Sequence, residues 1–295
     1  MRFKIYLILF VLFAFSCSSD SSSDNGTNNN GGNNNLGNTL LVSEIITSDV
    51  ESSDYVYSDR YFYDGNKLTS ITNEYTYQNG VPQQNGILNF IYTNNKISRI
   101  DEYYENNNTG ISGRYTFEYD NQGRVSFYDY CDFGNSGDCN YYDINNLSYS
   151  SNGTVTNAYV YDVGGNDQDA GTLTIQLDNS GNILSVIDSY QDVDANNNSV
   201  SVTVNASFEY DNQNSPFKNI IGMDAIILLE LNNNSLGSSL SFNAFNNCTS
   251  FTIEYSDEDE IYQYNYSYDY NEDGYPRQVI LMQNNYSSTI NINYY

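Results

Sequence analysis

Carboxylates are the most abundant groups in this sequence that could perform chemistry. The 295 residues contain 37 Asp and Glu against 10 Lys and Arg, and no His. The segment Asp269-Tyr270-Asn271-Glu272-Asp273-Gly274 matches the first half of a calcium-binding loop. The twelfth position of such a loop should hold an acidic ligand, and here it is Ile280. Asp269, Asn271 and Asp273 are therefore weak Ca²⁺ candidates, a plain turn is the better interpretation, and no other cofactor is expected.

The composition limits the functions that these acids could serve. The absence of His excludes Ser-His-Asp and Cys-His catalysis and His-ligated zinc. The excess of acids excludes most nucleic-acid binding, which needs clustered Lys and Arg. Paired carboxylates could hydrolyse glycosidic bonds, but among 37 acids no pair is distinguished by sequence. A second acidic loop of equally low specificity is formed by Asp188, Asp192, Asp194 and Asn196.

These observations predict a non-enzymatic protein with a binding or structural role. The first alternative is a glycan-binding accessory protein of a polysaccharide-uptake system. The sequence has 31 Tyr, whose rings could stack on sugars, although the stronger platform Trp is absent. A carboxylate-dependent hydrolase is the less favoured alternative. The expected partner is a glycan or a surface protein, and the sequence does not indicate an oligomeric state.

Three of the four cysteines lie in the body of the chain. Cys131 and Cys139 bracket a short polar loop, which outside the cytoplasm predicts a disulfide. Closing so small a ring contributes about 2.5 kcal/mol in the chain-entropy model. The alternative is a pair of free thiols. Cys248 has no obvious mate and is interpreted as a small buried apolar residue.

The N-terminus has the form of an export signal. Arg2 and Lys4 precede an uninterrupted apolar run, residues 5–15, whose 11 residues are too few to span a bilayer as a helix. The following Ala14-Phe15-Ser16-Cys17 resembles a bacterial lipobox. This resemblance implies that residues 1–16 are removed and that Cys17 becomes a lipid-modified first residue, through which the protein contacts the membrane. The alternative is an ordinary secretion signal with an incidental Cys.

Residues 17–39 are predicted to form a disordered tether. After Cys17 they consist almost entirely of Ser, Asp, Asn and Gly, which bury too little apolar surface to fold. Asp20 and Asp24 resemble the acidic export signal of lipoproteins in Bacteroidetes-type bacteria. That resemblance implies an outer-membrane lipoprotein that faces the cell exterior, whereas the alternative is a plain polar linker.

From residue 40 onward, aromatic and aliphatic residues alternate with polar ones. Two runs show this period most clearly, residues 202–210 and 262–270. A period of two predicts strands with one buried face, and Tyr suits such a face because its ring packs while its hydroxyl reaches a partner.

A turn of recurring form separates the strands. Its aromatic or aliphatic anchor stands at positions 63, 92, 119, 149, 177, 210 and 270. We expect the anchor to end a strand on the buried side, the next residue to bond its own backbone, and a Gly or Asn to take the left-handed position. The predicted turn residues are Tyr63, Asp64, Tyr119, Asp120, Gly123, Tyr210, Asp211 and Gly274.

This pattern resembles the YD repeat of RHS-type proteins, and most closely the short Bacteroidetes lipoproteins with degenerate YD-like repeats, a family of unknown function. The resemblance covers about residues 55–295 and is carried best by Tyr63-Asp64, Tyr119-Asp120 and Tyr210-Asp211. It implies an architecture of repeated hairpins and no particular chemistry.

The predicted fold is all-β. An antiparallel meander of repeated hairpins over residues 40–295 would form a curved, open or partly closed sheet, because isolated hairpins are marginally stable and must pair edge to edge. A short helical insertion is expected near 216–231, where Pro216 follows Ser215 and the apolar run lacks alternation. The alternative for the end of that insertion is a buried strand over residues 225–231.

Overall fold

The computed structural model describes most of the chain from residue 40 onward. The described ranges are 40–49, 55–77, 80, 82–104, 110–133, 138–139, 141–162, 168–193, 198–223, 225–226, 245–257, 261–283 and 286–295. The predicted signal peptide, Cys17 and the predicted tether all lie outside these residues. A membrane-crossing helix, which must be both long and apolar, is absent from the part of the chain that the structure describes.

Sixteen strands make up the described fold. They are β1 (Val42–Asp49), β2 (Tyr55–Asp64), β3 (Lys67–Tyr77), β4 (Pro82–Thr93), β5 (Lys96–Tyr104), β6 (Gly113–Tyr119), β7 (Val125–Asp132), β8 (Tyr141–Tyr149), β9 (Thr154–Asp162), β10 (Gln168–Leu177), β11 (Ile183–Val193), β12 (Ser199–Tyr210), β13 (Cys248–Tyr255), β14 (Ile261–Tyr270), β15 (Pro276–Gln283) and β16 (Tyr286–Tyr294).

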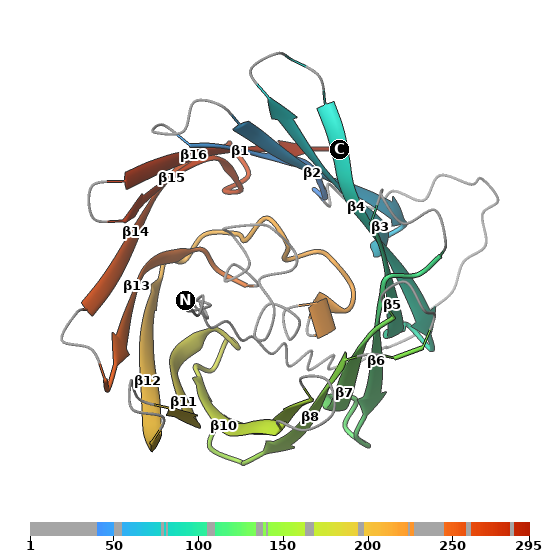
Figure 1. Cartoon of the computed structure of the whole chain (residues 1–295). Coiled ribbons are helices and arrows are strands. Elements are labelled where there is room, and N and C mark those ends of the chain that lie inside the picture. Colours follow the sequence, from blue (N-terminus) through green and yellow to red (C-terminus); the bar gives the residue numbers. More distant parts are fainter. Residues whose placement is uncertain are drawn as a thin grey trace, which may run out of the picture.

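The strands form a closed barrel in which each strand pairs antiparallel with its neighbours in sequence (Figure 1). The ring closes where β1 pairs with β16, with Ile45 opposite Ile292. The predicted open or partly closed sheet is therefore wrong. Each hairpin adds a similar twist to the ribbon, and after sixteen strands the two edges meet, which satisfies the backbone groups that an open edge would leave unpaired.

The predicted helical insertion is also wrong over residues 216–222. Residues 216–222 form turns and a single bridge to Lys67, and of the described residues after β12 only Met223, Ala225 and Ile226 are helical. The run starts in a turn, where the Ser215 hydroxyl accepts the Phe217 N–H at 3.0 Å. Gly222 then has a φ of 88°, a left-handed conformation that would interrupt a right-handed helix. Residues 227–244, where the alternative strand would end, lie outside the described residues.

The barrel wall has an apolar inner face and a polar outer face. In β12 the buried residues Val202, Val204, Ala206 and Phe208 alternate with Ser, Thr, Asn, Ser and Glu. The segment after β12 lies within the ring of strands (Figure 1) and packs on the buried face, where the rings of Phe217 and Tyr61 are 6.1 Å apart. The buried side chains of the strands therefore point into the barrel.

The two ends of the barrel differ. One end, the turn rim, carries the tight turns after β2, β4, β6, β8, β10 and β14, together with the start of β1 and the end of β16. There the Tyr295 N–H donates to the Leu41 carbonyl at 3.0 Å. The segment between β12 and β13 also leaves from this rim. The opposite end, the loop rim, carries the other connections, including the one between β7 and β8.

Candidate functional site

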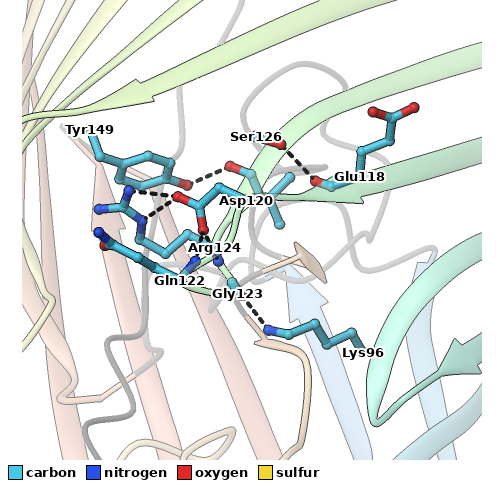
Figure 2. A network of polar contacts seen from close by, with 9 residues as sticks. Lys96, Glu118, Asp120, Gln122, Gly123, Arg124, Ser126 and Tyr149 are labelled. Atoms are coloured by element: carbon cyan, nitrogen blue, oxygen red, sulfur yellow. Dashed lines mark hydrogen bonds and ion pairs between the residues drawn. The ribbon is translucent and has the colours of Figure 1, made fainter.

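The repeated turns are held by their acidic residue, as Asp120 shows (Figure 2). Its Oδ1 accepts the backbone N–H groups of Gln122 and Arg124 at 2.8 and 2.9 Å. Its Oδ2 accepts the Arg124 side chain at 2.6 and 2.8 Å. Burial alone would raise the pKa of Asp120, but these hydrogen bonds and the Arg124 charge lower it below its usual value. Gly123 takes the left-handed position with a φ of 82°.

The anchor tyrosines join neighbouring hairpins. The hydroxyls of Tyr119 and Tyr149 donate to the backbone carbonyls of Ile97 and Val125, each at 2.7 Å. These carbonyls belong to the return strand of the preceding hairpin. The Arg124 guanidinium lies 4.0 Å from the centre of the Tyr149 ring (Figure 2), a cation–π contact with the next hairpin. The same contact recurs at two earlier repeats, between Lys67 and Tyr92 and between Lys96 and Tyr119.

The other predicted turn residues lie at the same rim. Tyr63 is the penultimate residue of β2 and packs edge-on against Tyr295, and Asp64 ends the strand and is exposed. Tyr210 ends β12. Asp211 then accepts the backbone N–H groups of Gln213 and Asn247 and the Tyr270 hydroxyl. Gly274 has a φ of 76° in the turn between β14 and β15.

The calcium candidates form part of that last turn. Asp269 is paired with Arg277 at 2.7 Å on the outer wall. Asn271 Oδ1 accepts the backbone N–H groups of Asp273 and Tyr275 at 3.1 and 2.9 Å, so it caps the turn as Asp120 does. Within the described ranges, no group of three or more His, Cys, Asp or Glu residues is arranged to hold a metal ion.

A disulfide joins Cys131 and Cys139 at the loop rim, between β7 and β8. Their Cα atoms are 5.5 Å apart. Cys248 is a buried thiol at the start of β13, and burial raises its pKa. These cysteines stabilise or fill the wall and lie apart from the acids described next.

Four acids that the sequence analysis did not assemble point into the barrel. Asp59, Glu102, Asp143 and Asp188 lie on β2, β5, β8 and β11 and are 7%, 5%, 1% and 0% exposed. We call these four residues the inner acid band. Burial raises the pKa of Asp59 and of Asp188 to about 6, and it raises the pKa of Glu102 above its usual value.

Glu102 and Asp188 each accept a hydrogen bond from a tyrosine that lies two strands away, with a glycine on the strand between. The Tyr130 hydroxyl donates to Glu102 Oε2 at 3.3 Å, and Gly113 lies on the strand between them. A Cβ on Gly113 would lie 2.6 Å from Glu102 Oε2 and 2.7 Å from the Tyr130 hydroxyl. Glycine is therefore needed there for the tyrosine to reach the acid.

A mirrored arrangement lies further around the wall. The Tyr159 hydroxyl donates to Asp188 Oδ1 at 2.8 Å, and a Cβ on Gly171 would collide with the Tyr159 ring. Tyr159 lies on β9 and reaches β11 across β10, whereas the first unit runs from β7 to β5 across β6. The two units therefore face in opposite directions around the ring, with β8 and its Asp143 between them.

Two buried acceptor atoms beside this second unit have no hydrogen-bond partner among the described residues. They are Asp188 Oδ2 and Asn157 Oδ1. The Asn157 amide donates to Asn145 Oδ1 at 2.8 Å, so its Nδ2 is used and its oxygen is not. Both Asn157 and Asp188 have 0% exposure. An unpaired buried acceptor is costly, so this part of the wall is suited to a donor.

A local signal for the band was present in the sequence. Asp188 occupies the same phase of the alternation as Val186 and Tyr190, which places it on the apolar face of β11. The interpretation of Asp188 as part of an acidic loop is therefore wrong. An acid in phase with apolar neighbours is the signal, and only the closed ring of strands shows that such acids face the same interior.

The opposite part of the inner wall is aromatic. The rings of Phe251 and Tyr264 stack at 4.2 Å with an angle of 10°, and Phe208 lies 5.7 Å from Phe251. Tyr266 and Tyr268 continue the series along β14 with ring centres 6.2 Å apart. The interior therefore carries its buried acids among apolar and aromatic side chains from β2 to β11, whereas its buried side chains from β12 to β14 are apolar or aromatic.

The outer wall carries charged networks at mid-strand. Arg60 on β2 bridges Glu44 on β1 and Glu74 on β3, each at 3.0 Å. On β5, Asp101 is paired with Arg99 at 3.0 Å and with Arg114 of β6 at 2.7 Å. These pairs are partly exposed and contribute little stability each, but they make the outer face hydrophilic.

Neither a protein-family model nor a curated protein matches this sequence. Two solved structures share its fold. A porin-like protein from Bacteroides vulgatus is 13% identical, has a TM-score of 0.52, and aligns over 87% of this chain and 99% of its own. A porin-like protein from Bacteroides uniformis is 15% identical, has a TM-score of 0.50, and aligns over 86% and 98%. At this identity the likeness establishes the barrel fold alone.

Proposed function

We propose that this protein is a non-enzymatic, lipid-anchored binding protein of the outer membrane whose barrel lies outside the bilayer. Lipid on Cys17 would hold it to the membrane, and residues 18–39 would separate the barrel from that surface. The barrel shares its fold with porin-like proteins, which supports an envelope location. It differs from a membrane-spanning wall in the chemistry of its outer face.

The polarity of the wall is the observation that carries this proposal. A spanning barrel needs an apolar outer band about 25 Å tall, and an Arg or Lys at the bilayer midplane costs roughly 2–4 kcal/mol. Here the outer face carries Arg60, Arg99 and Arg114 with their acidic partners, and the Ser, Thr, Asn and Glu residues of β12. The buried apolar side chains point inward, as they do in a barrel surrounded by water, although the outer face also exposes Phe62, Ile187, Ile280 and Met282.

The anchor and the two rims give the barrel an orientation. The tether would join the wall at the turn rim, where Asn219 donates to the Leu40 carbonyl at 2.9 Å. Residues 215–226 pack inside the same rim, through the contact of Phe217 with Tyr61 and a hydrogen bond from the Tyr92 hydroxyl to the Ile221 carbonyl at 3.1 Å. The loop rim would therefore face away from the membrane.

The test compares the full chain with a Cys17→Ser variant in a Bacteroidetes host. We expect the parent protein in the outer-membrane fraction, susceptible to protease on intact cells, and the variant in the soluble fraction without detergent. In planar bilayers the purified parent should add no conductance. A variant that stays inserted in the membrane, or a parent that conducts ions, would refute the proposal.

A glycan is a second candidate ligand because tyrosines are exposed at the loop rim. Tyr57, Tyr104 and Tyr286 are 46%, 47% and 62% exposed, and exposed aromatic rings stack on sugar faces. A glycan array probed with the full chain should then give hits that are lost when Tyr286 is replaced by Ala. An array without hits would eliminate this candidate.

A further inference from the structure

We propose that the acidic side of the barrel interior binds an organic ligand that carries N–H ammonium groups, with Asp188 as its principal contact. This inference rests on the proposed binding role and names the chemical class of the ligand.

Within the described residues, the side-chain hydrogen-bond partners of Asp59, Glu102 and Asp188 are uncharged Asn and Tyr side chains. Of the ten Lys and Arg residues, Arg2 and Lys4 belong to the predicted signal, and the other eight lie within the described ranges. None of these eight is at the band, because three lie at the turn rim, four on the outer wall, and one beside Asn214. Without the signal the formal charge is 8 − 37 = −29, which attracts cations.

The unsatisfied acceptors specify a donor rather than a bare charge. Asp188 Oδ2 and Asn157 Oδ1 are both buried oxygens, so the complementary group must donate hydrogen bonds. Both residues face Leu173 in the strand register, one from each side. Two strand spacings separate them, about 10 Å along the wall, which is within the reach of a ligand with two or more amine groups.

The band does not resemble a metal site. Its four carboxylates come from four strands that are not adjacent, and no described group of three acids gathers in one place. Calcium takes six to eight oxygen ligands at about 2.3–2.6 Å, which such a spread cannot supply. An elongated organic cation instead contacts acids one at a time.

The aromatic wall suits the carbon chain and charge of such a ligand. Phe251, Tyr264 and Tyr266 present stacked or tilted rings on the inner face of β13 and β14. Ammonium groups and their methylene chains bind aromatic faces favourably, and more so when desolvated. The interior thus offers anionic acceptors on one side and ring faces on another.

A ligand would approach the band from the loop rim. Glu102 Oε1 accepts the Tyr104 hydroxyl at 2.8 Å, and Tyr104 is 47% exposed at that rim. Asp143 is the third residue of β8, close to the same end. At the other end, residues 215–226 pack within the turn rim. A ligand would therefore reach the acids from the end that faces the medium.

The experiment is isothermal titration calorimetry on the full chain, extracted in mild detergent, with spermidine as the probe. We expect saturable binding of spermidine. Tetramethylammonium has the charge without N–H donors, hexane-1,6-diol has donors without the charge, and Ca²⁺ represents a metal. We expect no saturable binding of these three. The absence of spermidine binding, or equal binding of tetramethylammonium, would overturn the proposal.

Matched variants separate the band from the general negative charge. Asp188→Asn should weaken spermidine binding about tenfold or more, because it removes a buried charge-assisted acceptor. Glu209→Gln removes an exposed acid from the outer face of the adjacent β12 and should change binding by about twofold or less. Circular dichroism verifies the fold of both variants. Equal weakening by both variants would refute a specific site.

Failure of this inference is distinguishable from failure of the proposed function. If Cys17→Ser releases the protein and spermidine does not bind, the ligand class is wrong and the anchored barrel stands. If spermidine binds with the expected variant pattern while the parent protein conducts ions in bilayers, the binding site stands and the location outside the bilayer is wrong.

Discussion

At the scale of single residues, the same carboxylate has opposite properties in different parts of the wall. Asp120 lies at the turn rim, where hydrogen bonds and Arg124 stabilise its charged form and lower its pKa. Asp188 lies on the inner face, where burial favours its neutral form and raises its pKa to about 6. The first acid organises the backbone, whereas the second costs stability when it is ionised and is therefore available to a ligand.

The acids that cap the turns should stabilise the fold. We expect Asp120→Ala to lower the free energy of unfolding by about 1–3 kcal/mol, since it leaves two backbone N–H groups and the Arg124 side chain without their acceptor. Glu118→Gln removes a neighbouring exposed charge and should change it by less than about 0.5 kcal/mol. Urea denaturation measures both, and equal effects would contradict a capping role.

The band acids should make stability depend on pH. The folded pKa values of Asp59 and Asp188 are about 6, above the value of 3.8 expected when unfolded. The folded state thus holds more protons between these values, so the free energy of unfolding falls as pH rises from about 4 to 6 and then levels off. Each acid contributes up to roughly 3 kcal/mol to this fall.

Asp188→Asn should remove its share of that dependence and stabilise the protein at neutral pH. Denaturation midpoints between pH 4 and 8 measure the effect, with Asp269→Asn on the exposed outer wall as the control. Identical pH profiles for the parent and Asp188→Asn would show that this acid is not desolvated in the folded state.

At the scale of elements, each hairpin is joined to the next by side chains as well as by the ladder. Tyr119 and Tyr149 donate their hydroxyls to the preceding hairpin. After three of the turns, a basic residue lies over the tyrosine of the following hairpin. This explains why the repeat combines an aromatic, an acid and a base. One residue joins the hairpins, one caps the turn, and one covers the neighbouring ring.

The hydroxyl and the ring of the anchor tyrosine should contribute separately to the free energy of unfolding. Tyr149→Phe removes the hydrogen bond to the Val125 carbonyl and keeps the ring beneath Arg124, so we expect a loss of about 1 kcal/mol. Tyr286→Phe, at an exposed position of the loop rim, is the control and should have little effect. Thermal and urea unfolding measure both variants, and an unchanged Tyr149→Phe would show that packing alone joins the hairpins.

At the scale of the whole molecule, closure determines stability and the shape of the interior. β1 and β16 are the first and last strands of the barrel, and their pairing leaves the sheet without an edge strand. Ile45 and Ile292 face each other across this seam and are 1% and 4% exposed. The seam is therefore packed like the rest of the wall.

A substitution that leaves a cavity between β1 and β16 should destabilise the entire barrel, and it should not unfold one strand alone. Ile292→Ala is expected to cost about 2–4 kcal/mol and to leave a single cooperative unfolding transition. Ile280→Ala, at a 40% exposed outer position of β15, is the control and should cost less than about 1 kcal/mol. Hydrogen exchange confined to β1 and β16 in the Ile292→Ala variant would contradict a closed, cooperative ring.

The sequence by itself determined the features that depend on neighbouring residues. The period of two in residues 202–210 reports a buried face directly, and the turn at Asp120 and Gly123 follows from the chemistry of a few adjacent residues. The antiparallel pairing of consecutive hairpins follows from their short connections. The apolar run after Ser215 misled because it begins in turns, and helical conformation among the described residues starts only after the left-handed Gly222.

Only the tertiary structure decided closure and the contents of the interior. Whether sixteen twisted strands meet depends on accumulated tilt and register, which no local pattern encodes. Asp59, Glu102, Asp143 and Asp188 are separated by long stretches of sequence, and only the closed ring turns all four toward a shared interior. A candidate site assembled from distant strands is therefore a property of the closed barrel, because proximity arises only when every intervening strand is in place.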